Sequence, residues 1–279
     1  EAGRDARGQH VANLLAFQPD EAIAQVLAIP DYAAADYLVL ATRRGLVKKT
    51  RLTEYDSARQ GGIIAINLAD DDELISARLV ADTDDLLMVS RKGMSARFTA
   101  NDETLRPMGR ATSGVIGMRF RGDDALLAMD VVRPDTFVVT ITDGGFTKRT
   151  PVGDWATKGR GILGVRAMKL VEERGSLVGA MVCEASDQLF AIASNGVVIR
   201  TRVDQIRPSG RDTMGVTLMN LAEGDAIVAV ARGAESDVDD LDEAEGAETD
   251  GDVSDGVETD GAGVEAAEVV DVIEDEAAE

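Results

Sequence analysis

The stretch DYLVLATRRGLVKKT, residues 36–50, contains the pattern that recurs most clearly along this chain. An apolar run leads to a glycine, Gly45, and a second β-rich run follows it. A glycine between two such runs is typical of a β-hairpin, because type I′ turns need positive φ. The same pattern recurs three times, as DDLLMVSRKGMSARF (84–98), DTFVVTITDGGFTKRT (135–150) and DQLFAIASNGVVIRT (187–201). The chain is therefore a repeat of hairpins.

Two further patterns recur with the same spacing as the hairpins. The turn glycines are spaced by 48, 52 and 51 residues: Gly45, Gly93, Gly145 and Gly196. A second glycine opens a short apolar strand in every unit: Gly8, Gly62, Gly114, Gly164 and Gly215. The third pattern is an acidic or small turn followed by an apolar strand, as in DDELISARLV (71–80).

Each unit thus holds about four short strands in roughly 50 residues, which suits the blade of a β-propeller. We expect an all-β fold with four complete units and the second half of a fifth at 1–30, about four and a half blades in all. The array begins in mid-unit, so upstream residues are expected to complete it. Three patterns kept in phase over five units disfavour a β-sandwich with coincidental similarity. Apolar runs that are short, rich in Val, Ile and Leu and interrupted by glycines disfavour a helical solenoid.

Charge divides the chain into two parts. The formal net charge is −22, but residues 234–279 hold 20 acidic and no basic residues, so 1–233 carries only −2. The segment 234–279 also has no aromatic residue, and it cannot bury enough apolar surface to offset chain ordering. We predict a folded domain over 1–233 and a disordered acidic tail over 234–279.

Basic residues precede the first turn glycine, follow each turn glycine and recur before each second glycine. They are Arg43, Arg44, Lys48, Lys49, Arg51, Arg59, Arg97, Arg106, Arg110, Lys148, Arg149, Lys158, Arg160, Arg200, Arg202, Arg207 and Arg211. Neighbouring strand residues point to opposite faces, so one member of each adjacent pair is expected to face a given side. Acidic residues cluster elsewhere in the unit, as at Asp70 to Glu73. The shared register predicts a positive belt separated from acidic regions.

A positive belt could bind duplex DNA through counterion release, with little reading of bases. Aromatic residues for stacking single strands are scarce: one Trp, three Tyr and six Phe. For any one basic residue, ordinary solvation is the competing interpretation.

The residues offer no catalytic site. His10 is the only histidine, which excludes a histidine-based triad or a multi-histidine metal site within this chain. Cys183 is the only cysteine, so no intrachain disulfide can form, which fits a protein of the reducing cytoplasm. We expect Cys183 to be a small residue of the core. No apolar run approaches the ~18 residues of a membrane span. We expect no catalytic residue, metal or cofactor in this chain.

Four stretches together, RRGLVKKT (43–50), GRATSGVIGMRF (109–120), GVTLMNL (215–221) and ARGQHVANLLAF (6–17), resemble the C-terminal domain of bacterial DNA gyrase A subunits, in their actinobacterial form. The resemblance implies a six-bladed β-pinwheel with strands exchanged between neighbours. Its positive rim would wrap duplex DNA and support ATP-dependent negative supercoiling. In this family the enzyme is an A2B2 assembly, so the resemblance implies a partner B subunit. It also implies that the catalytic tyrosine and the sites for ATP and Mg lie in other parts of that enzyme. The enzyme would be cytoplasmic and would act on the DNA of the nucleoid.

The family's glycine-rich box, of the QRRGGKG type, has a degenerate match in KGRGILG (158–164). The match keeps Lys158, Gly159, Arg160, Gly161 and Gly164. Ile162 and Leu163 replace a glycine and a lysine of the box, which weakens the expectation that this chain wraps DNA fully. Two alternatives remain open: the corresponding domain of topoisomerase IV, and a propeller-like scaffold for protein interactions. We further expect the tail carboxylates to compete with DNA for the belt.

Overall fold

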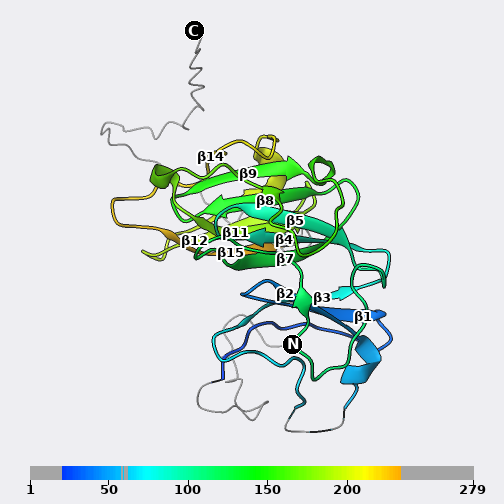
Figure 1. Cartoon of the computed structure of the whole chain (residues 1–279). Helices are drawn as coiled ribbons and strands as arrows, with labels where there is room; N and C mark the ends of the chain where they lie inside the picture. Colours follow the sequence, from blue (N-terminus) through cyan, green and yellow to red (C-terminus); the bar gives the residue numbers. More distant parts are fainter. Residues whose placement is uncertain (1–20, 58, 60–61, 234–279) are drawn as a thin grey trace, which may run out of the picture. The chain divides into compact units, whose positions relative to one another are not determined.

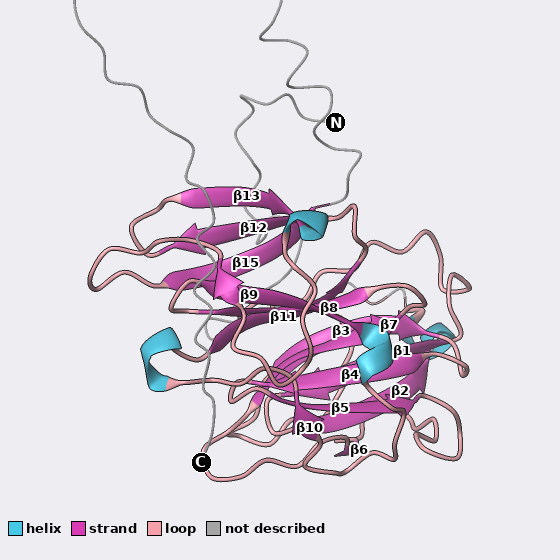
Figure 2. Ribbon diagram, turned by 90° about the horizontal axis from the view of Figure 1, so that it is seen from above, coloured by secondary structure: helices cyan, strands magenta, loops and turns pink. Residues whose placement is uncertain are grey.

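The computed structural model describes residues 21–57, 59 and 62–233. The expected half-unit therefore falls largely, and the tail at 234–279 wholly, outside the described residues. The described part contains fifteen β-strands, four short 3₁₀ segments and no α-helix (Figure 2). The 3₁₀ segments are η2 (Leu52–Tyr55), η3 (Val152–Asp154), η4 (Glu172–Arg174) and η5 (Val203–Gln205). The predicted all-β class is confirmed.

The strands form four antiparallel sheets, one for each hairpin, which we call blades 1 to 4 (Figure 1). Blade 1 has the order β3-β1-β2-β6, with β1 (Tyr37–Thr42), β2 (Leu46–Arg51), β3 (Leu74–Val80) and β6 (Val115–Ile116). Blade 2 has the order β10-β5-β4-β7, with β4 (Asp85–Ser90), β5 (Met94–Thr99), β7 (Leu126–Val132) and β10 (Val165–Arg166). Blade 3 has the order β11-β8-β9-β14, with β8 (Phe137–Thr142), β9 (Phe146–Pro151), β11 (Leu177–Cys183) and β14 (Val216–Thr217). Blade 4 has the order β13-β12-β15, with β12 (Gln188–Ala193), β13 (Val198–Arg202) and β15 (Ile227–Gly233).

Each of the four expected units forms the hairpin of one blade, and in units 2 to 4 the strand after the second glycine pairs in the preceding blade. Blade 4 therefore has three strands among the described residues, whereas blades 1 to 3 have four. The expected strand after Gly62 is wrong, since residues 62–68 form no strand. The corresponding segments at β6, β10 and β14 are strands only because a hairpin from the preceding blade accepts them.

The hairpin turns lie at the predicted glycines, but their type differs from the expectation. The N–H of Gly45 donates to Thr42 O at 2.9 Å, and Gly196 donates to Ala193 O at 2.9 Å. The glycine is therefore the last residue of a four-residue turn. A type I′ turn needs positive φ at both central residues. Among the described residues, Asp135 is the only non-glycine with positive φ, so these turns are not type I′.

Each blade exchanges a strand with its neighbour through what we call a crossing segment. The crossing segments are residues 101–118, 152–168 and 203–219. Each leaves the hairpin of one blade and returns along the outer edge of the preceding blade. Met108 N donates to Lys49 O at 2.8 Å, Lys158 N to Arg97 O at 2.8 Å, and Ser209 N to Arg149 O at 2.9 Å. Because the three crossing segments pair with the preceding blade in the same register, their basic residues lie at equivalent positions of successive blades.

The core lies between successive blades. One apolar cluster joins Val39 of blade 1 to Phe98 of blade 2, and a second joins Leu87 of blade 2 to Val138 of blade 3. A third joins Ile141 of blade 3 to Leu189 of blade 4. Sheets covered on both faces need strands that are apolar on both sides, as these strands are.

Candidate nucleic-acid interface

Two of the predicted belt lysines lie inside the protein. The Nζ of Lys48 donates to the carbonyl oxygens of Ala65 and Arg110, and the Nζ of Lys148 donates to Gly210 O at 2.8 Å and Arg211 O at 2.5 Å. The side chains are 0% and 1% exposed. Each ammonium therefore fastens a crossing segment to the strand beside it.

Burial changes the protonation of these lysines. It lowers the pKa of Lys48 to about 8, with Glu54 acting to raise that pKa and Arg110 to lower it. Burial likewise lowers the pKa of Lys148 to about 8. An ammonium taken out of water loses hydration, so the neutral amine becomes accessible at lower pH.

The neighbours of these lysines are buried too. Lys49 is 0% exposed and bonds Asp82 at 2.6 Å and Asp102 at 2.8 Å, with its ammonium 4.3 Å from the centre of the Tyr37 ring. Arg149 is 8% exposed, and its guanidinium lies 4.6 Å from the centre of the Phe137 ring. The expectation that one member of each pair faces the surface is wrong. Both faces of β2 and β9 are covered at these positions, so both side chains of each pair are buried.

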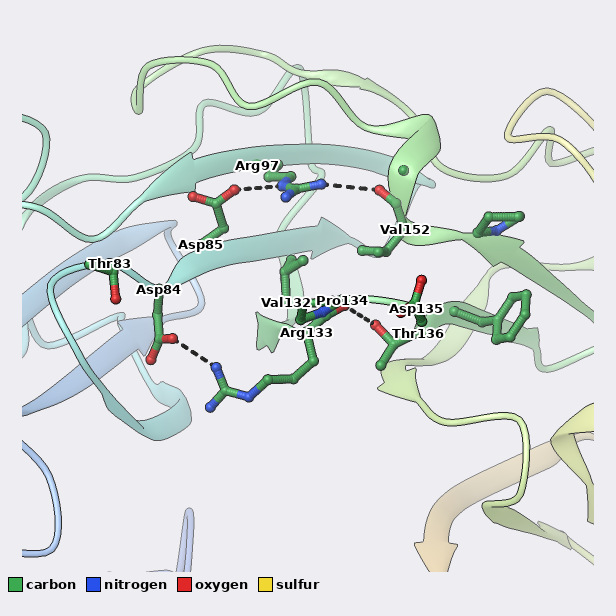
Figure 3. Close-up of a pocket in the computed structure, with 13 residues that line it drawn as sticks. Thr83, Asp84, Asp85, Arg97, Val132, Arg133, Pro134, Asp135, Thr136 and Val152 are labelled. Carbon is green, nitrogen blue, oxygen red and sulfur yellow. Dashed lines mark hydrogen bonds and ion pairs between the residues drawn. The ribbon is translucent and has the colours of Figure 1, made fainter.

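Arg97 also has internal partners. Its Nε bonds Asp85 at 2.8 Å, and its Nη1 donates to Val152 O at 3.2 Å, as Figure 3 shows. Burial acts to raise the pKa of Asp85, but hydrogen bonds from Thr99, Thr157 and Arg97 outweigh it, and the pKa lies below its usual value. In the same cavity, Arg133 bonds Asp84 at 2.8 Å. Both arginines that line this cavity are thus paired with its carboxylates.

The arginines at the first hairpin turn face acidic neighbours. Arg44 pairs with Asp71 at 2.9 Å and Arg43 with Glu73 at 3.4 Å. Lys92, at the next hairpin turn, pairs with Asp123. The predicted separation of acidic and basic residues is therefore wrong at this end of the blades, where the third pattern's turn lies beside the hairpin turn.

The crossing segments and their flanks differ from the hairpins. Exposed basic side chains here are Arg51, Arg59, Arg106, Lys158, Arg160 and Arg207, and Arg110 and Arg211 are half-buried. Within the described ranges, none of these eight lies within 4.0 Å of a carboxylate oxygen. Their positive charge is uncompensated locally.

Three of these arginines form a regular row. Arg110, Arg160 and Arg211 each stand four residues before the second glycine of their unit. Their Nη1 atoms donate to Ile64 O at 3.0 Å, Ile116 O at 3.0 Å and Arg166 O at 3.2 Å, respectively. Each acceptor stands two residues after the second glycine of the preceding unit. The bonds satisfy part of each guanidinium without neutralising it, and they place one arginine in each unit on the same backbone position.

The last blade places its arginines differently. Arg200 is exposed and donates from Nε to Gln188 Oε1 at 2.5 Å, whereas Arg202 pairs with Asp204 at 3.0 Å. Arg200 thus adds positive charge at β13, and Arg202 has its charge matched.

The degenerate glycine-rich box lies inside a crossing segment. Gly161 N donates to Gly117 O at 2.6 Å, which joins two crossing segments. Gly164 has φ +78°, and a Cβ there would lie 2.0 Å from Ser95 O. A Cβ at Gly159 would meet nothing within 4 Å. The glycines of the box therefore have unequal structural roles.

Sequence reasoning missed several exposed basic residues. Four of them, Arg91, Arg119, Arg121 and Lys169, have no carboxylate within 4.0 Å among the residues that the structure covers. The motifs MRF and MKL carried a usable signal, because Met118 and Met168 are each 1% exposed and the next residue must point outward.

Other kinds of site find little support in the described residues. No group of three His, Cys, Asp or Glu side chains there could hold a metal ion. No described helix is long and apolar enough to cross a membrane. Cys183 is buried, as expected, and burial raises the pKa of its thiol to about 12. His10 lies outside the described residues.

Repeated antiparallel blades that pass an edge strand to the preceding blade define a β-pinwheel, a propeller-like domain. Comparison with known families agrees. The model of the family described as "DNA gyrase C-terminal domain, beta-propeller" matches residues 36–81, 84–133, 136–184 and 187–232. The chain belongs to this family, and the predicted resemblance is confirmed.

Curated relatives and solved structures give the same assignment. The DNA gyrase A subunit of Streptomyces coelicolor is 64% identical over 241 residues, which cover 85% of this chain and 28% of that protein. The DNA gyrase A subunit of Mycobacterium tuberculosis H37Rv is 57% identical over 240 residues, covering 86% of this chain and 29% of the relative. The chain thus spans less than a third of these relatives.

Two solved structures share the fold. The C-terminal domain of a DNA topoisomerase IV has a TM-score of 0.75 at 25% identity, covering 82% of this chain and 71% of its own. A DNA gyrase A C-terminal domain has a TM-score of 0.71 at 24% identity, covering 82% of this chain and 76% of its own. The second likeness supports the fold alone.

Proposed function

We propose that the crossing segments bind duplex DNA and that the chain is the DNA-wrapping module of a type IIA topoisomerase, within its gyrase A subunit. The observation that carries the proposal is the row formed by Arg110, Arg160 and Arg211. Each guanidinium is anchored to a backbone carbonyl, carries uncompensated charge, and recurs at one position per unit.

The chemistry of this row suits a phosphate backbone. A guanidinium presents several donors in a rigid plane, so it can keep one bond to a carbonyl and offer others to a phosphate. Arg106, Arg207 and Lys158 add charge on the same segments. Phosphate contacts of this kind position DNA without reading its sequence, which suits a protein that wraps DNA of any sequence.

The activity of the whole enzyme is part of the proposal. The wrapped duplex would supply the crossing that strand passage converts into a negative supercoil, with ATP and Mg bound elsewhere. The catalytic tyrosine and the B subunit would belong to the rest of an A2B2 assembly, acting on cytoplasmic DNA. The names of the curated relatives support this assignment.

The test is the affinity of the 279-residue chain for duplex DNA as a function of salt. Since each neutralised phosphate adds about −0.9 to the slope of log K against log salt, we expect a slope on the order of −4 or steeper. A slope near zero would contradict the proposal and favour a protein-interaction scaffold.

Supercoiling separates the two topoisomerase interpretations. The full-length gyrase protein that carries this domain, reconstituted with ATP and its B subunit, is expected to introduce negative supercoils into relaxed plasmid. Relaxation or decatenation without supercoiling would assign the domain to a topoisomerase IV instead.

The acidic tail, 234–279, lies outside the described residues, and its competition with DNA stays a prediction. Removal of the tail is expected to tighten DNA binding, mainly at low salt, where screening is weakest. Equal affinity with and without the tail would leave it a solubilising segment.

A further inference from the structure

A basic residue stands at the same position of every hairpin. It is the fourth residue after the turn glycine, and it lies opposite the third residue of the first strand. The four residues at this position are Lys49, Arg97, Arg149 and Arg200. Because they occupy one position of a repeated fold, their surroundings can be compared directly.

In blades 1 and 2 the protein supplies a carboxylate for this charge. Lys49 pairs with Asp82 at 2.6 Å and with Asp102 at 2.8 Å. Arg97 pairs with Asp85 at 2.8 Å, as Figure 3 shows. A buried charge without a partner destabilises a fold, so these carboxylates are part of the architecture of the hairpin.

In blade 3 the corresponding charge has no such partner. Arg149 is 8% exposed, and its buried Nε has no hydrogen-bond partner. Among the residues that the structure describes, no carboxylate oxygen lies within 4.0 Å of its guanidinium, whose face lies against the Phe137 ring. A guanidinium does not deprotonate in proteins, so loss of the proton cannot relieve its burial.

The nearby carboxylate of Asp204 is committed to another arginine. It pairs with Arg202 at 3.0 Å. A hydrogen bond from Arg202 holds the pKa of Asp204 below its usual value, and the charge of Arg149 contributes to that shift. Asp204 therefore reduces the field of Arg149 without giving its guanidinium a hydrogen bond.

The sequence explains why the first carboxylate is missing. The loops 81–84 and 184–187 have the same turn, in which the last residue donates its N–H to the first residue's carbonyl at 3.1 Å and 3.3 Å. In both loops the side chain of the last residue also accepts the first residue's N–H, at 2.9 Å and 2.8 Å. The second residue is Asp82 in one loop and Ala185 in the other. Blade 3 thus has a methyl group where blade 1 has a carboxylate.

The other two carboxylate positions are lost as well. Asp102 and Gln205 each stand three residues after the second strand of a hairpin, and Gln205 accepts the N–H of Arg202 instead. The first residue of the first strand is Asp85 in blade 2 and Phe137 in blade 3. Every position that neutralises the charge in blades 1 and 2 therefore lacks a carboxylate around Arg149.

The place of the missing carboxylates is open to solvent. In blade 1 the side chains of Asp82 and Asp102 are 45% and 60% exposed, whereas Lys49 is 0% exposed. The two carboxylates thus lie on the solvent side of the lysine. Ala185 and Gln205, at the same positions beside Arg149, are both exposed. An ion from solution can therefore approach where the aspartates stand in blade 1.

We propose that Arg149 forms an oxyanion site between blades 3 and 4, which takes a phosphate or a carboxylate group in place of the missing aspartate. Phe137 covers one face of the guanidinium, which leaves the N–H groups in its plane for the ligand. A guanidinium binds two oxygens of such a group through parallel hydrogen bonds. The site does not rest on DNA binding.

The side-chain N–H signals of arginine report on this site directly in the 279-residue chain. The Nε–H signal of Arg149, assigned by its absence in Arg149→Met, is followed by nitrogen-15 NMR at constant ionic strength. Inorganic phosphate and, separately, acetate should each move this signal, with half-saturation on the order of 1–10 mM. The signal of Arg97, which keeps Asp85, should stay in place.

A gain of the missing carboxylate gives the sharpest variant. Ala185→Asp places an aspartate where Asp82 stands beside Lys49, so it should abolish the phosphate-induced shift and raise the urea midpoint of the chain. The matched control is Ala222→Asp, which adds the same charge at an exposed position at the other end of blade 4. The control should keep the phosphate-induced shift of the wild-type chain.

The source of the oxyanion is decided by a third titration with a short duplex DNA. Movement of the Arg149 signal by the duplex would identify a DNA phosphate as the ligand, whereas movement by phosphate and acetate alone would identify a free oxyanion. A signal that none of the three probes moves would overturn the site, even if the duplex binds elsewhere on the chain. An equal phosphate-induced shift in the wild-type chain and in Ala185→Asp would overturn it too.

Discussion

The second strands of the hairpins and the crossing segments beside them are both rich in basic residues. The adjacent basic pairs in β2 and β9 are buried, whereas many of the basic side chains in the crossing segments are exposed. Lys48 and Lys148 in the hairpins are buried and bond backbone carbonyls. Lys158 and Arg207 in the crossing segments are exposed. A basic residue beside a hairpin is therefore no sign of a nucleic-acid surface, because the carbonyls brought against the strand decide its environment.

The largest effect is expected at the glycine where a crossing segment meets its strand. Gly164→Ala forces positive φ on a side chain and brings its Cβ onto Ser95 O, so we expect a loss of about 4 kcal/mol in the free energy of unfolding. Gly159→Ala, in the same glycine-rich stretch, meets open space and should change stability by less than about 0.5 kcal/mol. Urea denaturation measures both, and similar values would contradict the docking geometry.

The buried lysines should matter next. Lys148→Met keeps the apolar stem but leaves Gly210 O and Arg211 O without their donor, and each unsatisfied buried acceptor costs about 1–3 kcal/mol. We expect a loss of about 2–4 kcal/mol in urea denaturation. The matched control, Lys158→Met, removes an exposed lysine and should stay within about 0.5 kcal/mol. Equal losses of unfolding free energy in the two variants would contradict the prediction that the buried lysine contributes more to stability than the exposed one.

The lowered pKa of Lys148 predicts a pH dependence with a definite sign. Folding lowers this pKa from 10.5 to about 8, so between these values the unfolded state binds the additional proton. Stability contributed by this site therefore rises with pH from about 8 to 10.5. The difference in unfolding free energy between the wild-type chain and Lys148→Met should grow across that window. A difference that stays constant or shrinks would contradict the assignment.

The smallest effect is expected at the hairpin turn. Arg44 and Asp71 form an exposed ion pair, and such pairs contribute about 0–1 kcal/mol. Arg44→Gln should change the free energy of unfolding by less than about 0.5 kcal/mol and should barely alter the salt dependence of DNA binding. A large loss of DNA affinity at low salt would place the turn end of the blades in the interface.

The hairpins could be predicted from the sequence because their signals are local. Gly45 and Gly196 stand between β-rich runs, and the chain turns at both. The burial of Lys48 could not be predicted, because its two acceptors are 17 and 62 residues away and reach it only when residues 62–68 and a crossing segment pack beside β2. The separation of charges failed for the same reason, since Glu73 meets Arg43 only after the third strand adds to the sheet.

The arginine row was only partly predictable. Arg110, Arg160 and Arg211 were predicted as part of the belt, and their common position four residues before a glycine is visible in the sequence. The backbone carbonyls to which they donate could not be predicted, because these belong to the preceding unit. The exchange of strands between blades followed from the family resemblance rather than from periodicity. A repeat in the sequence gives the spacing of units, whereas pairing between units depends on contacts about 70 residues apart.

The central claim is that the crossing segments, and not the hairpins, carry the DNA-binding charge. The most direct measurement compares two triple variants of the full chain by the salt dependence of duplex binding. Arg110→Gln, Arg160→Gln and Arg211→Gln together should reduce the slope of log K against log salt by about 3. Arg43→Gln, Arg44→Gln and Lys92→Gln together should leave it nearly unchanged, with thermal unfolding confirming that both variants fold. Equal reductions, or a larger one in the hairpin variant, would contradict the account.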